Sequence, residues 1–509
     1  MENTTSQTKA EAVREVEVGA KKENLEFLVS LPEENISKIL SASASITIDK
    51  YEALLGELSF SGQACLNFVY SLEDGTISNY KTCQDFSGKF ENLSFDPSSL
   101  VKVLPNVLDI SIESANGSAI KVKLTIENTF SLLKNQEISL FSSEDPNIYV
   151  KQSEIGLCTH ANRNCSNFNQ TSVFETKFSV GRILSTSSVA IVNKTSALDG
   201  IVVVEGDTIS RILYSTGEER PVLVSQVNKD SFREEIEDSM ATKDSPVLAW
   251  ATVDGRDIEE NIDQENKTIE VNVPVRICYD LFSCQERTVV SDAFSTENEL
   301  NLTTEAFLST EVVGMETFDS RIDSSITASE DIPRIDKILA VDGAYLTRTS
   351  LTFNDGELSS EGTVHLNIIY LNDEEDSINA VSVEVPYSYN EKLSNQGSNV
   401  VATDQIIEID ASVKRGRDIY VDGKIRTQVL VTNEVQTAAI SGAELGEKLE
   451  ERDGALEIYF AQEGKSFWDV AKDLKVSEDA LRQQNPEIVE PFEKDEKIVY
   501  FEQFEINVD

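Results

Sequence analysis

The residue types best suited to chemistry are few in this sequence, and three of them lie close together. Cys158, His160 and Cys165 follow the pattern Cys-x-His-x4-Cys, which places three possible metal ligands within eight residues. Structural zinc sites use four ligands, and no fourth Cys or His lies nearby. We interpret the three as incidental residues of a connecting segment. The alternative is a metal clip that a carboxylate or a partner completes.

Few other residues could support catalysis. The chain has only two histidines, His160 and His365, although most acid–base and nucleophilic sites use one. With 90 Asp and Glu in the chain, a pair of carboxylates has almost no diagnostic value for catalysis. Neither a Walker loop nor a dinucleotide-binding fingerprint is present. The sequence therefore predicts a protein that is not an enzyme and that uses no cofactor.

The cysteines are spread thinly along the chain. The amino-terminal residues contain no apolar stretch behind a basic region, so no secretory signal is expected. A protein that stays where it is made keeps its thiols reduced by default, and no paired spacing recurs along the chain. We therefore predict that no disulfide forms among the six cysteines, Cys65, Cys83, Cys158, Cys165, Cys278 and Cys284.

The charge balance is strongly acidic, with 90 Asp and Glu against 44 Lys and Arg and a formal net charge of -46. Nucleic acids and anionic membrane surfaces are bound by clustered Lys and Arg, so both are excluded as expected partners. No run of 18 apolar residues occurs, and no transmembrane helix is expected. Two interpretations of the charge stay open: solubility of an acidic chain, or a cationic partner.

The segments that must position these residues form a repeat. A Gly-x5-Gly-x7-Tyr spacing occurs three times, as Gly56-Gly62-Tyr70, Gly200-Gly206-Tyr214 and Gly356-Gly362-Tyr370. Each copy follows a similar entry, Lys38-Ile39-Leu40, Arg182-Ile183-Leu184 or Lys337-Ile338-Leu339. The basic residue precedes the tyrosine by 32, 32 and 33 residues. The sequence thus predicts three copies of one domain.

Each copy has the pattern of β-structure. Apolar residues alternate with polar ones around the second glycine, which is typical of half-buried strands, and a glycine inside such a strand indicates a bulge or bend. Similar alternation follows at 120–126, 269–275 and 425–431. The predicted organisation is a polar tail (1–24), repeats over 25–139, 178–293 and 332–438, connectors over 140–177 and 294–331, and a linker over 439–456.

Residues 457–503 have a different pattern. A short apolar strand at 458–460 precedes Ser466, which can cap a helix with Asp469 completing a capping box. Ser477 can cap a second helix that ends at Asn485-Pro486, and 498–501 form a closing strand. The predicted fold class is therefore mostly β: three tandem β-rich repeats and a small strand–helix–helix–strand module.

This module resembles the LysM domain in its element order and its two turns. The resemblance implies a shallow ligand groove beside the turns, which binds glycans rich in N-acetylglucosamine in that family. The groove residues carried over are Gly464, Lys465, Ser466, Phe467, Asn485, Pro486, Glu487 and Ile488. The sequence departs from the family at Lys465, where an Asp is usual, and at Asp495-Glu496, where Pro-Gly is usual.

The three upstream copies resemble the SPOCS domain of endospore-forming bacteria in their Lys-Ile-Leu entry, glycine-interrupted strand and terminal Tyr. Three such copies before a LysM-like module resemble a family of clostridial spore-coat morphogenetic proteins. That resemblance implies a scaffold or adaptor whose LysM-like module binds the coat's basal ATPase in the mother-cell cytoplasm, at the forespore surface. The runner-up is a protein that binds peptidoglycan of the cell wall or cortex.

The turn around Lys465 and Phe467 is the candidate protein contact of the module. An aromatic and a charged residue on an exposed turn are typical of binding hot spots. The alternative is that Phe467 packs under the first helix and that Lys465 is solvated.

Overall fold

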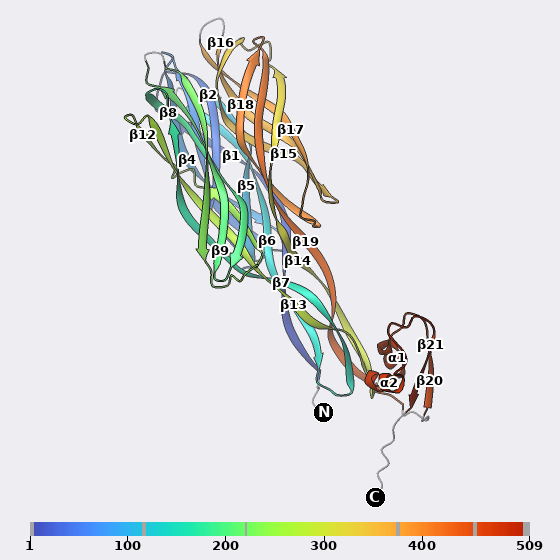
Figure 1. Cartoon of the computed structure of the whole chain (residues 1–509). Coiled ribbons are helices and arrows are strands. Elements are labelled where there is room, and N and C mark those ends of the chain that lie inside the picture. Colours follow the sequence, from blue (N-terminus) through green and yellow to red (C-terminus); the bar gives the residue numbers. More distant parts are fainter. Residues whose placement is uncertain (1–4, 115–118, 219–220, 373–376, 451–455, 502–509) are drawn as a thin grey trace.

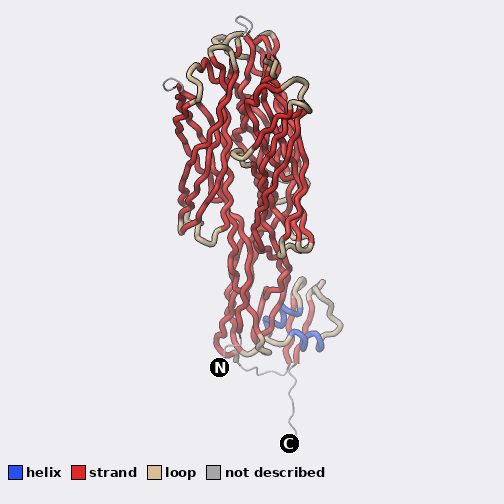
Figure 2. The backbone as a smooth tube through the Cα atoms, turned by 90° about the vertical axis from the view of Figure 1, so that its left-hand side faces the viewer, coloured by secondary structure: helices blue, strands red, loops and turns tan. Residues whose placement is uncertain are grey.

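The computed structural model describes residues 5–114, 119–218, 221–372, 377–450 and 456–501. These residues are mostly β-strand, as the sequence predicted, with two short helices near the carboxyl end. The molecule is elongated (Figures 1 and 2): a broad head of packed sheets narrows into a stalk of long strands, and a small module lies beside the end of the stalk.

The head contains three units with one strand plan. The first unit has a meander of β2 (Ile36–Leu54), β3 (Glu57–Leu72) and β4 (Ile77–Glu91). Its second sheet has the order β1-β6-β5, from β1 (Thr5–Ser30), β5 (Leu100–Ser114) and β6 (Ala119–Ser143). The two sheets enclose a core that includes Phe68, Tyr70 and Phe130. The unit is therefore a two-layer β-sandwich.

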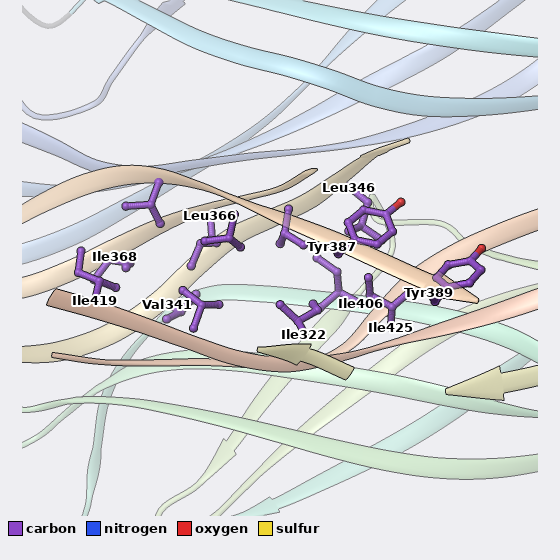
Figure 3. Packing of buried hydrophobic residues seen from close by; sticks show 14 of the residues in the cluster. Ile322, Val341, Leu346, Leu366, Ile368, Tyr387, Tyr389, Ile406, Ile419 and Ile425 are labelled. Carbon is purple, nitrogen blue, oxygen red and sulfur yellow. The ribbon is translucent and has the colours of Figure 1, made fainter. Parts of the chain in front are cut away.

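The second and third units follow the same plan. In the second, β7 (Ile148–Glu175) and β13 (Thr268–Ser295) pair beside the meander β8 (Val180–Leu198), β9 (Ile201–Thr216) and β10 (Leu223–Glu237). Two short strands, β11 (Val247–Val253) and β12 (Glu259–Asp263), take the place that β5 has in the first unit. In the third, β14 (Asn298–Thr327), β19 (Asp418–Lys448) and β18 (Asn399–Lys414) face the meander β15 (Ile335–Asn354), β16 (Glu357–Asn372) and β17 (Ile378–Lys392). Figure 3 shows the core between these two sheets, where side chains such as Val341, Leu366 and Ile425 meet.

The repeated tyrosine and glycine have the same structural place in each unit. Tyr70, Tyr214 and Tyr370 are almost fully buried in the three cores. The second glycine of each set lies where the neighbouring strand has a β-bulge: Gly62 opposite Ile48, Gly206 opposite Val192 and Gly362 opposite Arg348. A Cβ there would lie 2.1, 2.3 and 2.4 Å from a carbonyl oxygen of that strand. The bulge is thus in the partner strand, and glycine is required by the close approach of its backbone.

The leucines of the three entry motifs lie in one cluster where the three units meet. Leu40, Leu184 and Leu339 are bulged residues, because the register skips each of them. They meet in one apolar cluster with the residues that precede the three tyrosines, Val69, Leu213 and Ile369. β3 and β4 contact β8, β10 contacts β15, and β16 and β17 contact β2. The three units therefore close a ring around a pseudo-threefold axis.

The predicted polar tail was wrong, and the segments expected to be connectors and a linker contain long strands that extend the repeats beyond their predicted bounds. Residues 5–24 belong to β1, which pairs with β6 along its whole length. The connectors at 140–177 and 294–331 contain β7 and β14, the counterparts of β1, and β19 continues to Lys448. In the predicted tail, the polar composition hid the pattern because the few buried side chains, such as Ala10 and Ala12, are small and lie among charged residues. Residues 1–4, 451–455 and 502–503 of the predicted ranges lie outside the described residues.

The stalk consists of the outer parts of three paired ribbons, β1/β6, β7/β13 and β14/β19 (Figure 2). Small apolar clusters hold the ribbons together; one contains Ile138, Leu157, Val289 and Phe307. Backbone pairing satisfies the main-chain polar groups, so a narrow apolar seam is enough to join the ribbons.

The prediction of free thiols was wrong. Disulfides join Cys65 to Cys83 between β3 and β4, and Cys158 to Cys284 and Cys165 to Cys278 between β7 and β13. Each pair lies directly opposite in the antiparallel register. The strand register brings the sulfur atoms together, and the sequence separations of 18, 126 and 113 gave no sign of it.

Candidate binding surface on the C-terminal module

The C-terminal module has the predicted element order. β20 (Leu456–Ala461) pairs antiparallel with β21 (Glu496–Phe501), and α1 (Phe467–Leu474) and α2 (Glu478–Gln484) lie between them in the chain. Ser466 and Asp469 form a capping box at the start of α1, and the Ser477 side chain caps α2. Local capping and an apolar helix face are therefore enough to specify this small domain.

The first predicted turn contributes one side chain, that of Phe467, to the core of the module. Gly464 adopts a φ of +85°, which a residue with a side chain would strain to reach. Phe467 is only 1% exposed and packs edge-on against Phe492, with ring centroids 5.3 Å apart. The guanidinium of Arg482 lies 5.0 Å from the centre of the same ring. Of the two alternatives for Phe467, the structure shows the one in which it packs inside the module, and not the exposed edge.

Lys465 is engaged within the module. Its Nζ donates to the Tyr459 hydroxyl at 2.7 Å and to Asp473 Oδ2 at 2.8 Å. These hydrogen bonds, with Asp473 making the larger contribution, raise the pKa of Lys465. The ammonium is therefore a structural tie between β20 and α1.

The second predicted turn holds β21 in place. The Asn485 side chain is buried and bonds to both the N–H and the C=O of Val499. Pro486 and Glu487 are exposed, and Ile488 packs partly against the core. Two backbone hydrogen bonds join the first turn to Phe492: the Gly464 N–H donates to the Phe492 carbonyl, and the Phe492 N–H donates to the Lys465 carbonyl. The polar groups of Lys465, Ser466 and Asn485 are thus satisfied inside the module.

A surface that the sequence analysis did not identify lies on the sheet. Leu456, Ile458, Phe460 and Phe501 are 60%, 46%, 75% and 42% exposed. Leu456 lies opposite Phe501, and Phe460 lies opposite Lys497. The alternate residues of the same strands, including Ala461 and Ile498, pack with the helices. We call the face formed by Leu456, Ile458, Phe460 and Phe501 the outer sheet face; contiguous exposed apolar side chains are typical of protein contact sites.

The sequence contained part of this signal. Leu456, Ile458 and Phe460 alternate along β20, but Tyr459 between them and Ala461 after them are also apolar. A strand that is apolar on both faces does not reveal which face is covered. Only the packing of the helices distinguishes the two.

The side of α1 that carries Trp468 and Lys472 contacts the stalk. Trp468 Nε1 donates to Asp292 Oδ2 at 2.9 Å, and Lys472 Nζ bonds to Asp292 Oδ1 at 2.7 Å. The Trp468 ring packs against Phe294, with centroids 5.1 Å apart. Burial raises the pKa of Asp292, but the hydrogen bonds from Lys472 and Trp468 outweigh it, and the pKa is lowered overall. The module is therefore docked on β13 through a charged, partly buried contact.

The Cys-x-His-x4-Cys residues do not come together as ligands. Cys158 and Cys165 are each consumed by a disulfide to β13. His160 Nε2 lies 2.9 Å from Asp280 Oδ1, which Arg163 also contacts at 2.7 Å. Within the described segments, no group of three or more His, Cys, Asp or Glu side chains is arranged to hold a metal ion. The candidate metal clip is contradicted because its thiolates are not available.

Comparison with known families gives one match. Residues 334–415, which span β15 to β18 of the third unit, match the model of the SipL, SPOCS domain family. No curated protein and no solved structure matches the chain. The match supports a SipL-like, sporulation-related protein, and this is not a known enzyme family. In the part of the chain that the structure describes, no helix is long and apolar enough to cross a membrane.

Proposed function

We propose that this chain is a non-enzymatic scaffold or adaptor of endospore coat assembly, made of three SPOCS domains and a LysM module. The observation that carries the proposal is the match of residues 334–415 to the SipL, SPOCS domain family. The proposed location is the mother-cell cytoplasm at the forespore surface.

The shared plan of the three units supports extending the SPOCS assignment to the first and second. All three have a meander packed on a second sheet, a bulged entry leucine and a glycine opposite a bulge. Independent domains would have no reason to repeat both irregularities at equivalent positions, because bulges are specific features of a family.

The element order and capping of the C-terminal module support its assignment as LysM. We propose that the module docks a coat morphogenetic protein, by resemblance the coat's basal ATPase, through its outer sheet face. An apolar face flanked by Lys497 suits a partner that buries apolar side chains and offers a carboxylate to the rim. The three linked units would then hold further coat components around the head.

Peptidoglycan binding is the alternative. A glycan needs hydrogen-bonding groups that are free to receive its hydroxyls and amides. The predicted groove has few such groups, because Lys465 bonds to Asp473 and Tyr459, and Asn485 bonds to Val499. The internal use of these side chains favours a protein ligand.

The test compares the full-length chain with a chain that ends at Lys448. Each is incubated with a lysate of sporulating cells and, separately, with purified peptidoglycan. We expect the full-length chain to capture the coat ATPase, identified by mass spectrometry, and the shortened chain to lose it. Sedimentation of the full-length chain with peptidoglycan, together with failure to capture the ATPase, would move the function to the cell wall or cortex.

A further inference from the structure

The three interfaces of the ring are filled differently. Ile191 and Ile209 of the second unit pack against Ile407 of the third. Between the first and second units, Arg256 forms an ion pair with Asp49 at 2.9 Å. The interface that closes the ring, between the third and first units, contains a groove of about 600 Å³. Its walls come from β2 and β5 on one side and from β15, β16 and β17 on the other.

An additional residue in the third unit lies at this groove. Lys337 and Tyr370 are separated by 33 residues, whereas the other two copies have 32. In the structure, the register passes from Asp342 opposite Asn367 to Tyr345 opposite His365, which leaves an irregularity at Gly343. The corresponding stretch of β2, Ser43 to Ser45, pairs without a shift. Bulges commonly redirect side chains beside binding sites, and this one precedes the aromatic residue of the groove.

The groove has an aromatic wall. Tyr345 is half-buried and stacks on His365, with centroids 4.6 Å apart and ring planes 4° from parallel. His365 is held from both nitrogens, by Thr347 Oγ1 at 2.9 Å and by Glu384 at 3.4 Å. At the equivalent positions, the first unit has Ser45 and Cys65 and the second has Val189 and Ile209. The polar aromatic pair is thus particular to the third unit.

The charges that line the groove are two carboxylates, Asp109 and Glu384, and one ammonium, Lys38. Lys38 Nζ is engaged by the side-chain oxygen of Asn379. Burial raises the pKa of Tyr345 to about 12, and the charges of Asp109 and Glu384 act in the same direction. The Tyr345 phenol is therefore neutral at physiological pH, and the unbalanced charge of the wall is negative.

We propose that this groove binds an alkylammonium group, as found on polyamines and on lysine side chains. An aromatic face attracts a cation that comes within about 6 Å of its centre, and a nearby carboxylate adds a charge-assisted hydrogen bond. A neutral or anionic ligand would gain neither interaction. The site is separate from the outer sheet face of the C-terminal module and does not depend on the function proposed for it.

The experiment is calorimetric titration of the full-length chain in about 0.15 M salt, where surface charges are screened beyond about 8 Å. The probes are spermidine, a tetralysine peptide with blocked ends, and the same peptide with acetylated lysines. We expect saturable binding of one cationic probe per chain and none of the acetylated peptide. Preference for spermidine would identify a free polyamine as the ligand, and preference for the peptide would identify a lysine of a partner.

Two variants locate the site. Glu384→Lys introduces a like charge beside Tyr345 and is expected to weaken binding about tenfold or more, the factor that about 1.4 kcal/mol represents. Glu391→Lys makes the same charge change further along β17, outside the groove, and is expected to leave binding unchanged. Tyr345→Phe keeps the ring and is expected to bind, whereas Tyr345→Leu is not; thermal melting verifies that each variant is folded.

Three results would overturn the proposal. The first is no saturable binding of either cationic probe. The second is an equal loss in Glu391→Lys and Glu384→Lys, which would indicate diffuse attraction to an acidic surface. The third is unchanged affinity in a folded Glu384→Lys variant.

Discussion

Replacement of Phe460 by serine separates a binding role of the outer sheet face from a structural one. The Phe460 ring is 75% exposed, so its loss should change the free energy of unfolding by no more than about 0.5 kcal/mol. An aromatic side chain that becomes buried at the centre of an interface contributes about 2 kcal/mol or more. That loss raises the Kd for the partner about 30-fold, at about 1.4 kcal/mol for each factor of ten.

The assay is a titration of the coat ATPase into the full-length chain, with thermal melting of each variant. Leu28→Ser is the matched control, since Leu28 is a 71% exposed apolar residue in β1, distant from the module in sequence. Phe467→Ala is unsuitable as evidence, because a buried Phe contributes about 3–5 kcal/mol to stability and its loss would unfold the module. Wild-type affinity in Phe460→Ser, with a loss in a folded Lys465→Ala variant, would refute the outer sheet face as the contact.

Three further predictions concern the scaffold. Gly206→Ala should lower the free energy of unfolding by about 1–3 kcal/mol because its Cβ would meet the Ile191 carbonyl oxygen at 2.3 Å. Gly156→Ala is the control, since a Cβ at Gly156 would have nothing within 4 Å. Equal denaturant midpoints for the two variants would contradict this prediction. The pKa of Asp292 is lowered in the folded protein, so its contribution to module docking is present above the unfolded pKa of about 3.9. That contribution is lost as pH falls through the lower folded pKa. Hydrogen exchange in α1 should therefore rise at that low pH, and Asp292→Asn should show the same rise at pH 7. A non-reducing peptide map should show Cys165 linked to Cys278, and their replacement by serine should cost about 2–4 kcal/mol; free thiols at both positions would contradict the structure.

The sequence predicted features that arise from local chemistry. The spacing of Gly62 and Tyr70, with its two repetitions, identified two equivalent positions in each unit. The glycine lies opposite a bulge, and the tyrosine is buried in the core. Ser466 and Ser477 identified the starts of two short helices. These predictions succeeded because capping and alternation depend on neighbours that are near in the chain.

The features that the sequence did not predict depend on pairing between distant strands. β1 was expected to be a tail because its buried residues, such as Ala10 and Ala12, are small and lie among charged ones. The cysteine pairs follow from the register of β7 with β13, which spacing does not specify. The ring could not be inferred because only a few residues on the second face of each meander, such as Val69, Leu213 and Ile369, are covered by the other units.

The place of Phe467 was left open between an exposed edge and the core, and the structure shows it in the core. The face formed by Phe467, Val470 and Ala471 already indicated a core helix, and all three are buried. The exposed edge was considered as well because the groove of the resembling family begins at that turn. No family resemblance pointed to the outer sheet face. Only the positions of the helices show that this face of the sheet is uncovered.

The most direct test of the proposed function is a paired binding measurement on the purified, full-length chain. The coat ATPase is titrated in one experiment and oligomers of N-acetylglucosamine in the other, under the same buffer and salt. We predict saturable binding of the ATPase that Phe460→Ser weakens about 30-fold, and no saturable binding of the oligomers. Saturable binding of the oligomers, without binding of the ATPase, would contradict this prediction.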